Sequence, residues 1–269
     1  MKREIETEIF LAKEAVDLVK RRPNYAKMVA GLYLLSLFGP ERSRVMRASF
    51  TTVEFVDDLL DGDAQGIINL LAYVQDLNHR IATDSLSNSR IERLLRYSLD
   101  VLESKAKLND DPRGDFVTAI NAIIFDHERA SQRRVLSAGE IEQYYRNAFD
   151  PVINIALLAI DSNLRIGDIP VFSYGLGGAY SVRDFEVDWK RGIINVPGDV
   201  ISFAGLSPHS SFEEVGGNPK IIDWLHQSLE TSKQYLLKTQ LLLRQSREKR
   251  TQVVGNSFIS PMLKYIEEH

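Results

Sequence analysis

Residues 55–63 read FVDDLLDGD and end a segment of otherwise apolar helical periodicity. Asp57 and Asp61 are four residues apart, so they lie on one face of a helix, one turn from each other. Repulsion between such like charges costs roughly 0.2–0.5 kcal/mol, and the negative end of the helix dipole disfavours acids further. A divalent cation that joins the two carboxylates to a substrate would reverse this penalty. The stretch therefore predicts a metal-dependent site at the end of an apolar helix.

A second acidic pair of the same design lies in the segment VRDFEVDWKRG. Asp184 and Asp188 are again four residues apart at the end of an apolar helical segment, and Arg183, Lys190 and Arg191 lie beside them. Mg²⁺ is usually held by one or two protein carboxylates together with substrate phosphates and water. Neighbouring cationic side chains would bind the phosphate oxygens. One such pair is typical of a solvated helix end, whereas two pairs at matched spacing favour a site for magnesium and a diphosphate.

The rest of the chain has the composition of a helical globular protein. Of the 269 residues 44% are hydrophobic, and only 16 are Gly and 9 are Pro, which leaves few turns and favours long helices. We find no internal repeat and no linker rich in Gly, Pro and Ser. Apolar residues recur every three or four positions near residues 5–19, 25–38, 45–62, 64–83, 87–106 and 115–134. We therefore predict a single all-α domain over residues 1–269.

Capping signals predict where the later helices begin. Ser137 and Glu140 have the spacing of a capping box, which predicts a helix to about residue 160. Asn218 before Pro219 predicts a long helix to about residue 252. Residues 109–114 are expected to form a loop, and residues 191–217 to be irregular.

Charge and cysteine content exclude several classes of protein. The net charge is −4, from 33 Lys and Arg against 37 Asp and Glu, and no long basic block occurs, so nucleic acid is not an expected partner. The absence of cysteine excludes disulfides, thiol nucleophiles and thiolate-bound metals and favours a cytoplasmic location. The longest apolar run, residues 28–38, is shorter than the roughly 18 residues that indicate a membrane span, and no secretory signal is expected.

Both acidic motifs resemble those of the squalene and phytoene synthase family, the head-to-head trans-prenyltransferases with the class I isoprenoid synthase fold. The resemblance covers roughly residues 25–200. Four stretches carry it: DDLLD at 57–61, RDFEVD at 183–188 with Gly192 and Pro197 after it, LFGPER at 37–42, and SAGEIEQY at 137–144.

This resemblance implies a helical bundle around a central apolar cavity, with both motifs at its mouth holding three Mg²⁺ ions against a prenyl diphosphate. Its metal ligands would be Asp57, Asp61, Asp184 and Asp188, and Arg183 would be the principal catalytic contact to the diphosphate. Lys190 and Arg191 are further candidates for the diphosphate, and Asp58 for the substrate. Because aromatic faces stabilise cations, Tyr25 and Tyr144 are candidates to line a prenyl pocket, and core packing explains both tyrosines equally well. The implied reaction is the Mg²⁺-dependent ionisation of a C15 or C20 prenyl diphosphate, followed by its condensation.

Several positions depart from the family pattern. Glu54 stands where the family usually has an arginine, and Gly177 and Tyr180 stand where Gln and Asn commonly precede the second motif. These departures affect the expected rearrangement more than the ionisation. Prenyl transfer to another acceptor and class I terpene cyclisation therefore stay open, as does a catalytically silent family member that acts in assembly. Peripheral membrane contact through a lipid product and a homodimer also stay open.

Three weaker signals are interpreted structurally. YGLGG at 174–178 follows no strand, so close helix packing or a widened cavity wall is favoured over a phosphate loop. His127 has no second histidine at a zinc-ligand spacing, so a surface or network role is favoured over metal binding. Arg129, Arg133 and Arg134 are expected to form a solvated helix face.

Overall fold

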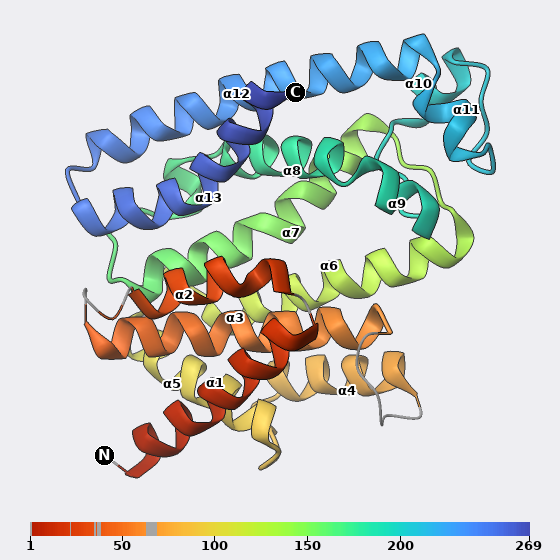
Figure 1. Cartoon of the computed structure of the whole chain (residues 1–269). Coiled ribbons are helices and arrows are strands. Elements are labelled where there is room, and N and C mark those ends of the chain that lie inside the picture. Colours follow the sequence, from red (N-terminus) through yellow and green to blue (C-terminus); the bar gives the residue numbers. More distant parts are fainter. Residues whose placement is uncertain (1, 22, 35, 37–38, 63–68) are drawn as a thin grey trace. The chain divides into compact units, whose positions relative to one another are not determined.

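The structure, a computed structural model, describes residues 2–21, 23–34, 36, 39–62 and 69–269 (Figure 1). These residues form thirteen α-helices and contain no strand, which confirms the predicted all-α class. In the same residues we find no helix that combines the length and the apolar character needed to cross a bilayer. The helices, with the 3₁₀ segments η1 and η3, are α1 Lys2–Arg21, η1 Pro23–Tyr25, α2 Ala26–Leu34, α3 Pro40–Leu60, α4 Leu70–Ala82, α5 Arg90–Lys105, α6 Pro112–Gln132, α7 Ala138–Ala159, η3 Ile166–Asp168, α8 Phe172–Arg183, α9 Phe185–Arg191, α10 Gly198–Phe203, α11 Phe212–Gly216, α12 Pro219–Gln245 and α13 Lys249–Glu268.

The helices group into two compact units. Unit 1 consists of Met1–Ile124 and Pro151–Asn163, and unit 2 of Phe125–Asp150 and Leu164–His269. The division falls within α6 and within α7. The single domain expected over residues 1–269 stays a prediction, and each unit is described by itself below.

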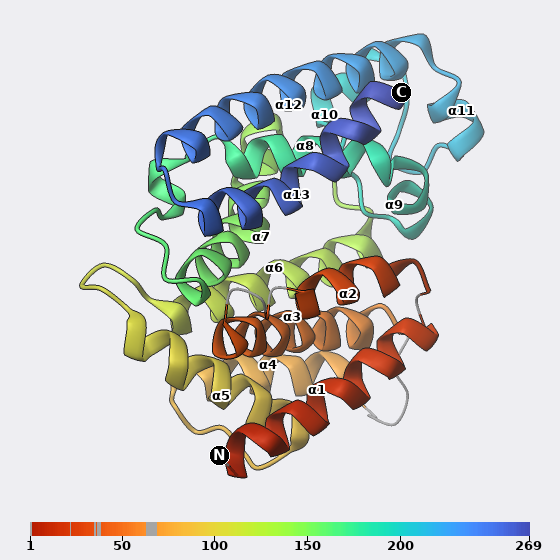
Figure 2. The same cartoon turned by 60° about the vertical axis from the view of Figure 1, so that its left-hand side comes forward.

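Unit 1 is organised around α3, which packs against α1, α2, α4 and α5 (Figures 1 and 2). The face of α3 that carries Val45, Val56 and Leu59 is almost fully buried. Leu94 and Leu95 of α5 are fully buried as well. Apolar side chains three, four and seven positions apart form one stripe on a helix, so their burial holds α3 in a fixed rotation about its axis. That rotation determines which acids at the end of α3 are exposed.

Unit 2 contains a close contact between α8 and its neighbours. A Cβ atom at Gly177 would overlap the ring of Tyr145 on α7, and a Cβ at Gly178 would overlap the Ser232 hydroxyl on α12. A Cβ at Gly175 would lie 3.0 Å from the Leu236 side chain of α12. The glycines of YGLGG therefore permit tight helix packing, as predicted from the lack of a preceding strand.

Capping predicts the helix starts better than the helix ends. The predicted capping box is confirmed, since the Ser137 backbone N–H donates to Glu140 Oε2 at 2.8 Å and the Glu140 N–H donates to Ser137 Oγ at 3.3 Å. The expected single helix to residue 252 is wrong: α12 ends at Gln245, because Arg247 adopts a left-handed conformation with φ of 56° before α13 begins.

Both segments that were expected to lack regular structure contain helical residues. Pro112 is the first residue of α6, so only residues before it remain in the expected 109–114 loop. A proline is favourable at a helix start, where its missing N–H has no partner to lose. Residues 191–217 contain the short helices α10 and α11, and α11 begins at a capping box between Ser211 and Glu214 that we had not predicted.

Candidate functional site

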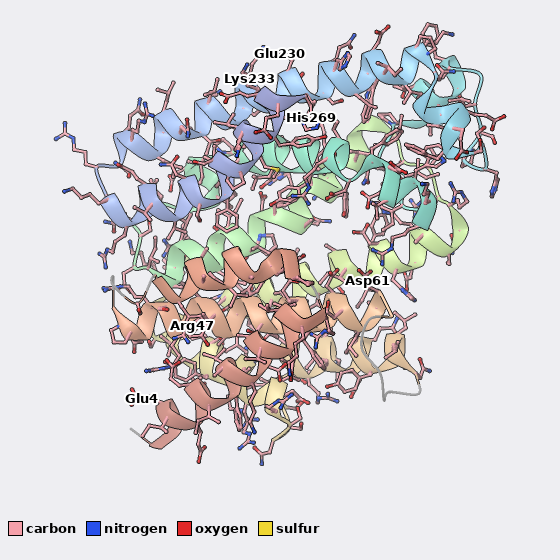
Figure 3. The ribbon with its side chains drawn as sticks, in the orientation of Figure 1. Glu4, Arg47, Asp61, Glu230, Lys233 and His269 are labelled. Atoms are coloured by element: carbon pink, nitrogen blue, oxygen red, sulfur yellow. The ribbon has the colours of Figure 1, made fainter. Side chains whose placement is uncertain are left out.

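The first acidic pair lies at the C-terminal end of α3 in unit 1. The Asp61 backbone N–H donates to the Asp57 carbonyl at 2.9 Å, so the two residues are one helical turn apart, as predicted. Both residues are half-buried. Figure 3 shows Asp61 at the end of the helix. Because Asp61 is the residue that caps α3, its carboxylate adds to the negative end of the helix dipole.

Asp58, between these two acids, is directed into unit 1. Its side chain is only 1% exposed, and its Oδ2 accepts hydrogen bonds from Arg21 Nη2 at 2.5 Å and Nε at 3.2 Å. The pair joins the end of α3 to the end of α1. Its expected role as a substrate contact stays a prediction, although this carboxylate already has a structural partner.

The other expected residues of unit 1 add little to this geometry. Tyr25 lies in η1 and is half-buried, as is Glu54 on α3. Pro40 is the first residue of α3, while Leu37 and Phe38 of the LFGPER stretch lie outside the described residues. A role of Tyr25 in substrate binding stays a prediction.

The second acidic pair lies in unit 2, at the junction of two helices. It was expected at the end of a single helix, but α8 ends at Arg183, and Asp184 separates it from the short helix α9, which carries Asp188. The break follows from the backbone of Asp184, whose φ of −98° and ψ of 7° are not helical. The Asp188 N–H still donates to the Asp184 carbonyl at 2.8 Å, so the spacing of one turn is kept.

Of the three cationic side chains expected beside this pair, Arg183 donates hydrogen bonds to it. Arg183 donates from Nε to Asp184 Oδ1 at 2.8 Å and from Nη2 to Oδ2 at 2.6 Å, and its guanidinium lies 4.3 Å from the centre of the Tyr180 ring. Lys190 is exposed and pairs with Glu186. Arg191 is exposed as well. Arg183 therefore contacts the pair directly, and its bidentate geometry is one that a diphosphate also accepts.

Behind the second pair lies a polar network that sequence reasoning missed. Arg129 of α6 is 1% exposed, so its expected place on a solvated face is wrong. Its Nε donates to Asp126 Oδ1 at 2.7 Å, its Nη2 to Asn195 Oδ1 at 2.7 Å and its Nη1 to the Ile194 carbonyl at 3.2 Å. Asn195 in turn donates from Nδ2 to Asp188 Oδ2 at 3.0 Å. The network thus connects α6 to the predicted ligand Asp188.

The neighbouring charged residues, His127 on α6 and Arg133 and Arg134 just after it, differ from Arg129. Arg134 is exposed and pairs with Glu140 at 3.0 Å, and His127 is exposed, both as predicted. Arg133 is half-buried and donates to the carbonyls of Trp189 and Pro208, which contradicts its expected solvation. Arg133 follows the end of α6 and has a left-handed backbone with φ of 47°, so helical spacing gave no signal for its contacts.

Tyr144 and Tyr145 on α7 complete the surroundings of the network. The Tyr144 hydroxyl donates to Asp126 Oδ2 at 2.5 Å, and the Arg129 guanidinium lies 4.5 Å from its ring centre. Burial, together with the charge of Asp126, raises the pKa of Tyr144 well above its usual value. Tyr145 donates to Ser181 Oγ at 2.8 Å, and burial raises its pKa to about 12. Both phenols therefore stay protonated and act as hydrogen-bond donors.

Asp188 has unusual electrostatics. Burial, followed by the charges of Asp184 and Asp126, raises the pKa of Asp188 to about 7, although Arg129 and Arg191 act in the opposite direction. Asp184 and Asp188 supply carboxylate oxygens, the protein ligands by which Mg²⁺ is usually held. In the described part of the chain, no group of three or more acidic or histidine side chains is arranged to hold a metal ion.

The raised pKa of Asp188 predicts how stability depends on pH. In the unfolded chain the pKa of this carboxyl is about 3.9, so protonation stabilises the folded state relative to the unfolded chain. This stabilisation is fully present below about pH 4 and is lost as the pH rises through about 7. Asp188→Asn cannot ionise and is expected to keep this stability. With a chelator present, the midpoint of thermal unfolding of Asp188→Asn minus that of the wild type should be larger at pH 8 than at pH 5 by about 2–4 °C or more. This change corresponds to about 1 kcal/mol of stability. A midpoint difference that is the same at both pH values would contradict the assignment.

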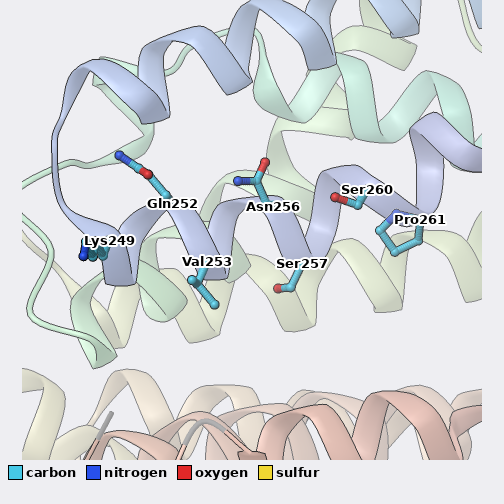
Figure 4. Close-up of a pocket in the computed structure, with 7 residues that line it drawn as sticks. All are labelled: Lys249, Gln252, Val253, Asn256, Ser257, Ser260 and Pro261. Atoms are coloured by element: carbon cyan, nitrogen blue, oxygen red, sulfur yellow. The ribbon is translucent and has the colours of Figure 1, made fainter. Parts of the chain in front are cut away.

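A pocket elsewhere in unit 2 contains none of the expected site residues. It lies along α13 (Figure 4) and is lined by Lys249, Gln252, Val253, Asn256, Ser257, Ser260 and Pro261. The central apolar cavity expected from the resemblance stays a prediction, as does the sharing of metal ions between the two acidic pairs, which belong to different units.

Comparisons with known proteins do not assign a family. No model of a known protein family matches the chain, and no curated protein matches it either. The resemblance to the squalene and phytoene synthases therefore rests on the motifs themselves.

Proposed function

We propose that this chain is a Mg²⁺-dependent prenyltransferase of the squalene and phytoene synthase type, which ionises a C15 or C20 prenyl diphosphate and condenses it. The observation that carries the proposal is the second acidic pair. Asp184 and Asp188 are one turn apart, Arg183 makes a bidentate contact beside them, and a buried network leads to Asp188. The first pair, Asp57 and Asp61, repeats the spacing.

Charge supports a role in holding a metal diphosphate. Mg²⁺, when bound, neutralises the negative charge that develops on a departing diphosphate. Asp57, Asp61, Asp184 and Asp188 are the residues that would hold it, because carboxylates crowded together gain most from a divalent cation. Arg183 would bind the diphosphate oxygens, exchanging its present contact to Asp184 for one to the substrate.

Aromatic residues of unit 2 would suit the hydrocarbon part of the substrate. Tyr144 packs against Phe125 and Tyr145, with ring centres 6.0 and 5.9 Å apart, and Phe149 stacks on Tyr180 at 5.6 Å. Aromatic faces stabilise cations, and an apolar surrounding excludes the water that would quench an allylic cation. The rings of Phe125, Tyr144 and Tyr145 adjoin the polar network, since Tyr144 belongs to both.

Release of pyrophosphate tests the proposal. The folded full-length chain is incubated with farnesyl or geranylgeranyl diphosphate and Mg²⁺, and pyrophosphate is measured with and without a chelator. We expect Mg²⁺-dependent release with at least one donor. Absence of release with both donors, from a sample that circular dichroism shows to be helical and that melts cooperatively, would sink the enzymatic proposal.

Analysis of the products separates the active alternatives. A linear product with twice the carbon number of the donor supports condensation, a cyclic product with the carbon number of the donor supports terpene cyclisation, and an adduct supports transfer to another acceptor. One observation favours a catalytically silent protein instead. Glu54 places a further acid on the helix of the first motif, where the family usually has an arginine.

A further inference from the structure

The end of α6 and the residue just after it hold α9 and the segment that follows α9. Arg133 donates from Nη2 to the Trp189 carbonyl at 2.9 Å and from Nε to the Pro208 carbonyl at 2.5 Å. Arg129, one turn earlier, donates to the Ile194 carbonyl. The backbones approach closely here, because a Cβ at Gly192, whose φ is 90°, would overlap the Ala130 carbonyl oxygen. The two arginines therefore anchor α9 and the segment after it to the C-terminal end of α6.

Arg129 also contacts the acidic motif through one intervening side chain. Asn195 is 7% exposed, accepts from Arg129 at Oδ1 and donates to Asp188 Oδ2 from Nδ2. An amide whose oxygen and nitrogen are both engaged has a single favourable orientation. The Arg129 guanidinium therefore fixes the orientation of the Asn195 amide, and the amide in turn fixes the position of one oxygen of Asp188.

The other side of the guanidinium is fixed as well. Asp126 accepts from Arg129 at Oδ1 and from the Tyr144 hydroxyl at Oδ2, so it balances the buried charge and is held by α7. Burial of an arginine is costly unless the charge is paired and its donors are satisfied. An apolar side chain at this position would pack at lower cost, so the polar arrangement calls for a role beyond packing.

We propose that Arg129 and Asn195 are positioning residues that orient the Asp188 carboxylate for cation binding. With Asn195 donating to Oδ2, Oδ1 is the oxygen left to bind the ion. This inference rests on the proposed function, in which Asp188 is a metal ligand. Partners that lie behind a metal ligand typically contribute about 10–100-fold to metal affinity.

Binding of Mn²⁺, a paramagnetic substitute for Mg²⁺, tests the inference without catalysis. The dissociation constant is measured by electron paramagnetic resonance on the full-length chain with inorganic pyrophosphate present. Asn195→Ala and Arg129→Lys are expected to raise it by about tenfold or more. Arg133→Lys is the matched control, because it keeps the charge and disturbs the same segment but does not contact Asn195 or Asp188; its dissociation constant is expected to stay within about twofold of the wild type.

The outcomes separate this inference from the proposed function. If the wild type binds Mn²⁺ and the Asn195 and Arg129 variants bind it as tightly as Arg133→Lys does, the network is structural only and the inference is wrong. If the wild type binds no Mn²⁺, the proposed function fails, and the inference fails with it. Should Arg129→Lys not fold, Asn195→Ala decides the question alone, because it removes no charge and leaves the pair of Arg129 with Asp126 intact.

Discussion

Asp57→Asn is expected to lower the rate of Mg²⁺-dependent pyrophosphate release from a prenyl diphosphate by at least about 100-fold. The reason is the loss of one carboxylate that would hold the metal diphosphate, where about 2.7 kcal/mol of transition-state stabilisation corresponds to that factor. The same change removes the repulsion between like charges four residues apart on a helix, which by itself raises stability by roughly 0.2–0.5 kcal/mol when a chelator is present. Steady-state kinetics and thermal unfolding measure the two effects.

Asp100→Asn is the matched control for this prediction. Asp100 is an exposed acid on α5 of the same unit, so its neutralisation changes the net charge equally. Its rate of release should stay within about twofold of the wild type. The catalytically silent alternative predicts a different pattern: Asp57→Asn becomes more stable, and neither protein is stabilised by Mg²⁺ with a diphosphate. If Asp100→Asn lowered the rate of pyrophosphate release as much as Asp57→Asn does, a specific role of Asp57 would be contradicted.

Trp189→Ala is expected to destabilise the chain by about 3–5 kcal/mol, the cost typical of deleting a large buried aromatic side chain. Trp189 is 2% exposed and belongs to a cluster with Phe185, Ile194 and Val196. Its Nε1 donates to the Ser210 carbonyl at 3.0 Å. In the variant this carbonyl loses its hydrogen-bond donor. Since Trp189 follows Asp188 directly on α9, the loss should also raise the Mn²⁺ dissociation constant. Urea unfolding followed by circular dichroism measures the stability.

Trp224→Ala serves as the comparison for Trp189→Ala. Trp224 is only half-buried and packs against the same cluster from α12. Its truncation should cost less than half as much, because less apolar area is removed from the core. The chain has two tryptophans, so each variant keeps one fluorescent reporter of unit 2. Equal losses of stability in the two variants would show that Trp189 is not the anchor of this cluster.

The all-α class and the local signals were predictable because they depend on neighbours in the sequence. The turn that joins Asp57 to Asp61, the capping box at Ser137 and the start of α12 at Pro219 all involve residues within four positions. Such contacts follow from helical periodicity and capping chemistry. The break at Arg247 was missed because neither glycine nor proline marks it.

The network behind Asp188 was not predictable for the opposite reason. Arg129 meets Asn195 across 66 positions in the sequence, and no periodicity reports such a contact. A basic residue on a helix is usually exposed to solvent, so the residue type of Arg129 indicates exposure. In the structure Arg129 is only 1% exposed. The placement of Asp184 between α8 and α9 likewise depends on a backbone change at one residue within an apolar pattern.

The most direct measurement of the central claim is the location of metal ions in crystals grown with Mn²⁺ and a prenyl thiolodiphosphate that resists ionisation. Anomalous scattering identifies each Mn²⁺ and its protein ligands. We predict ions that contact the carboxylates of both pairs, Asp57 with Asp61 and Asp184 with Asp188, and that share the diphosphate between them. Ions bound to one pair only, or a diphosphate bound apart from both, would contradict the account.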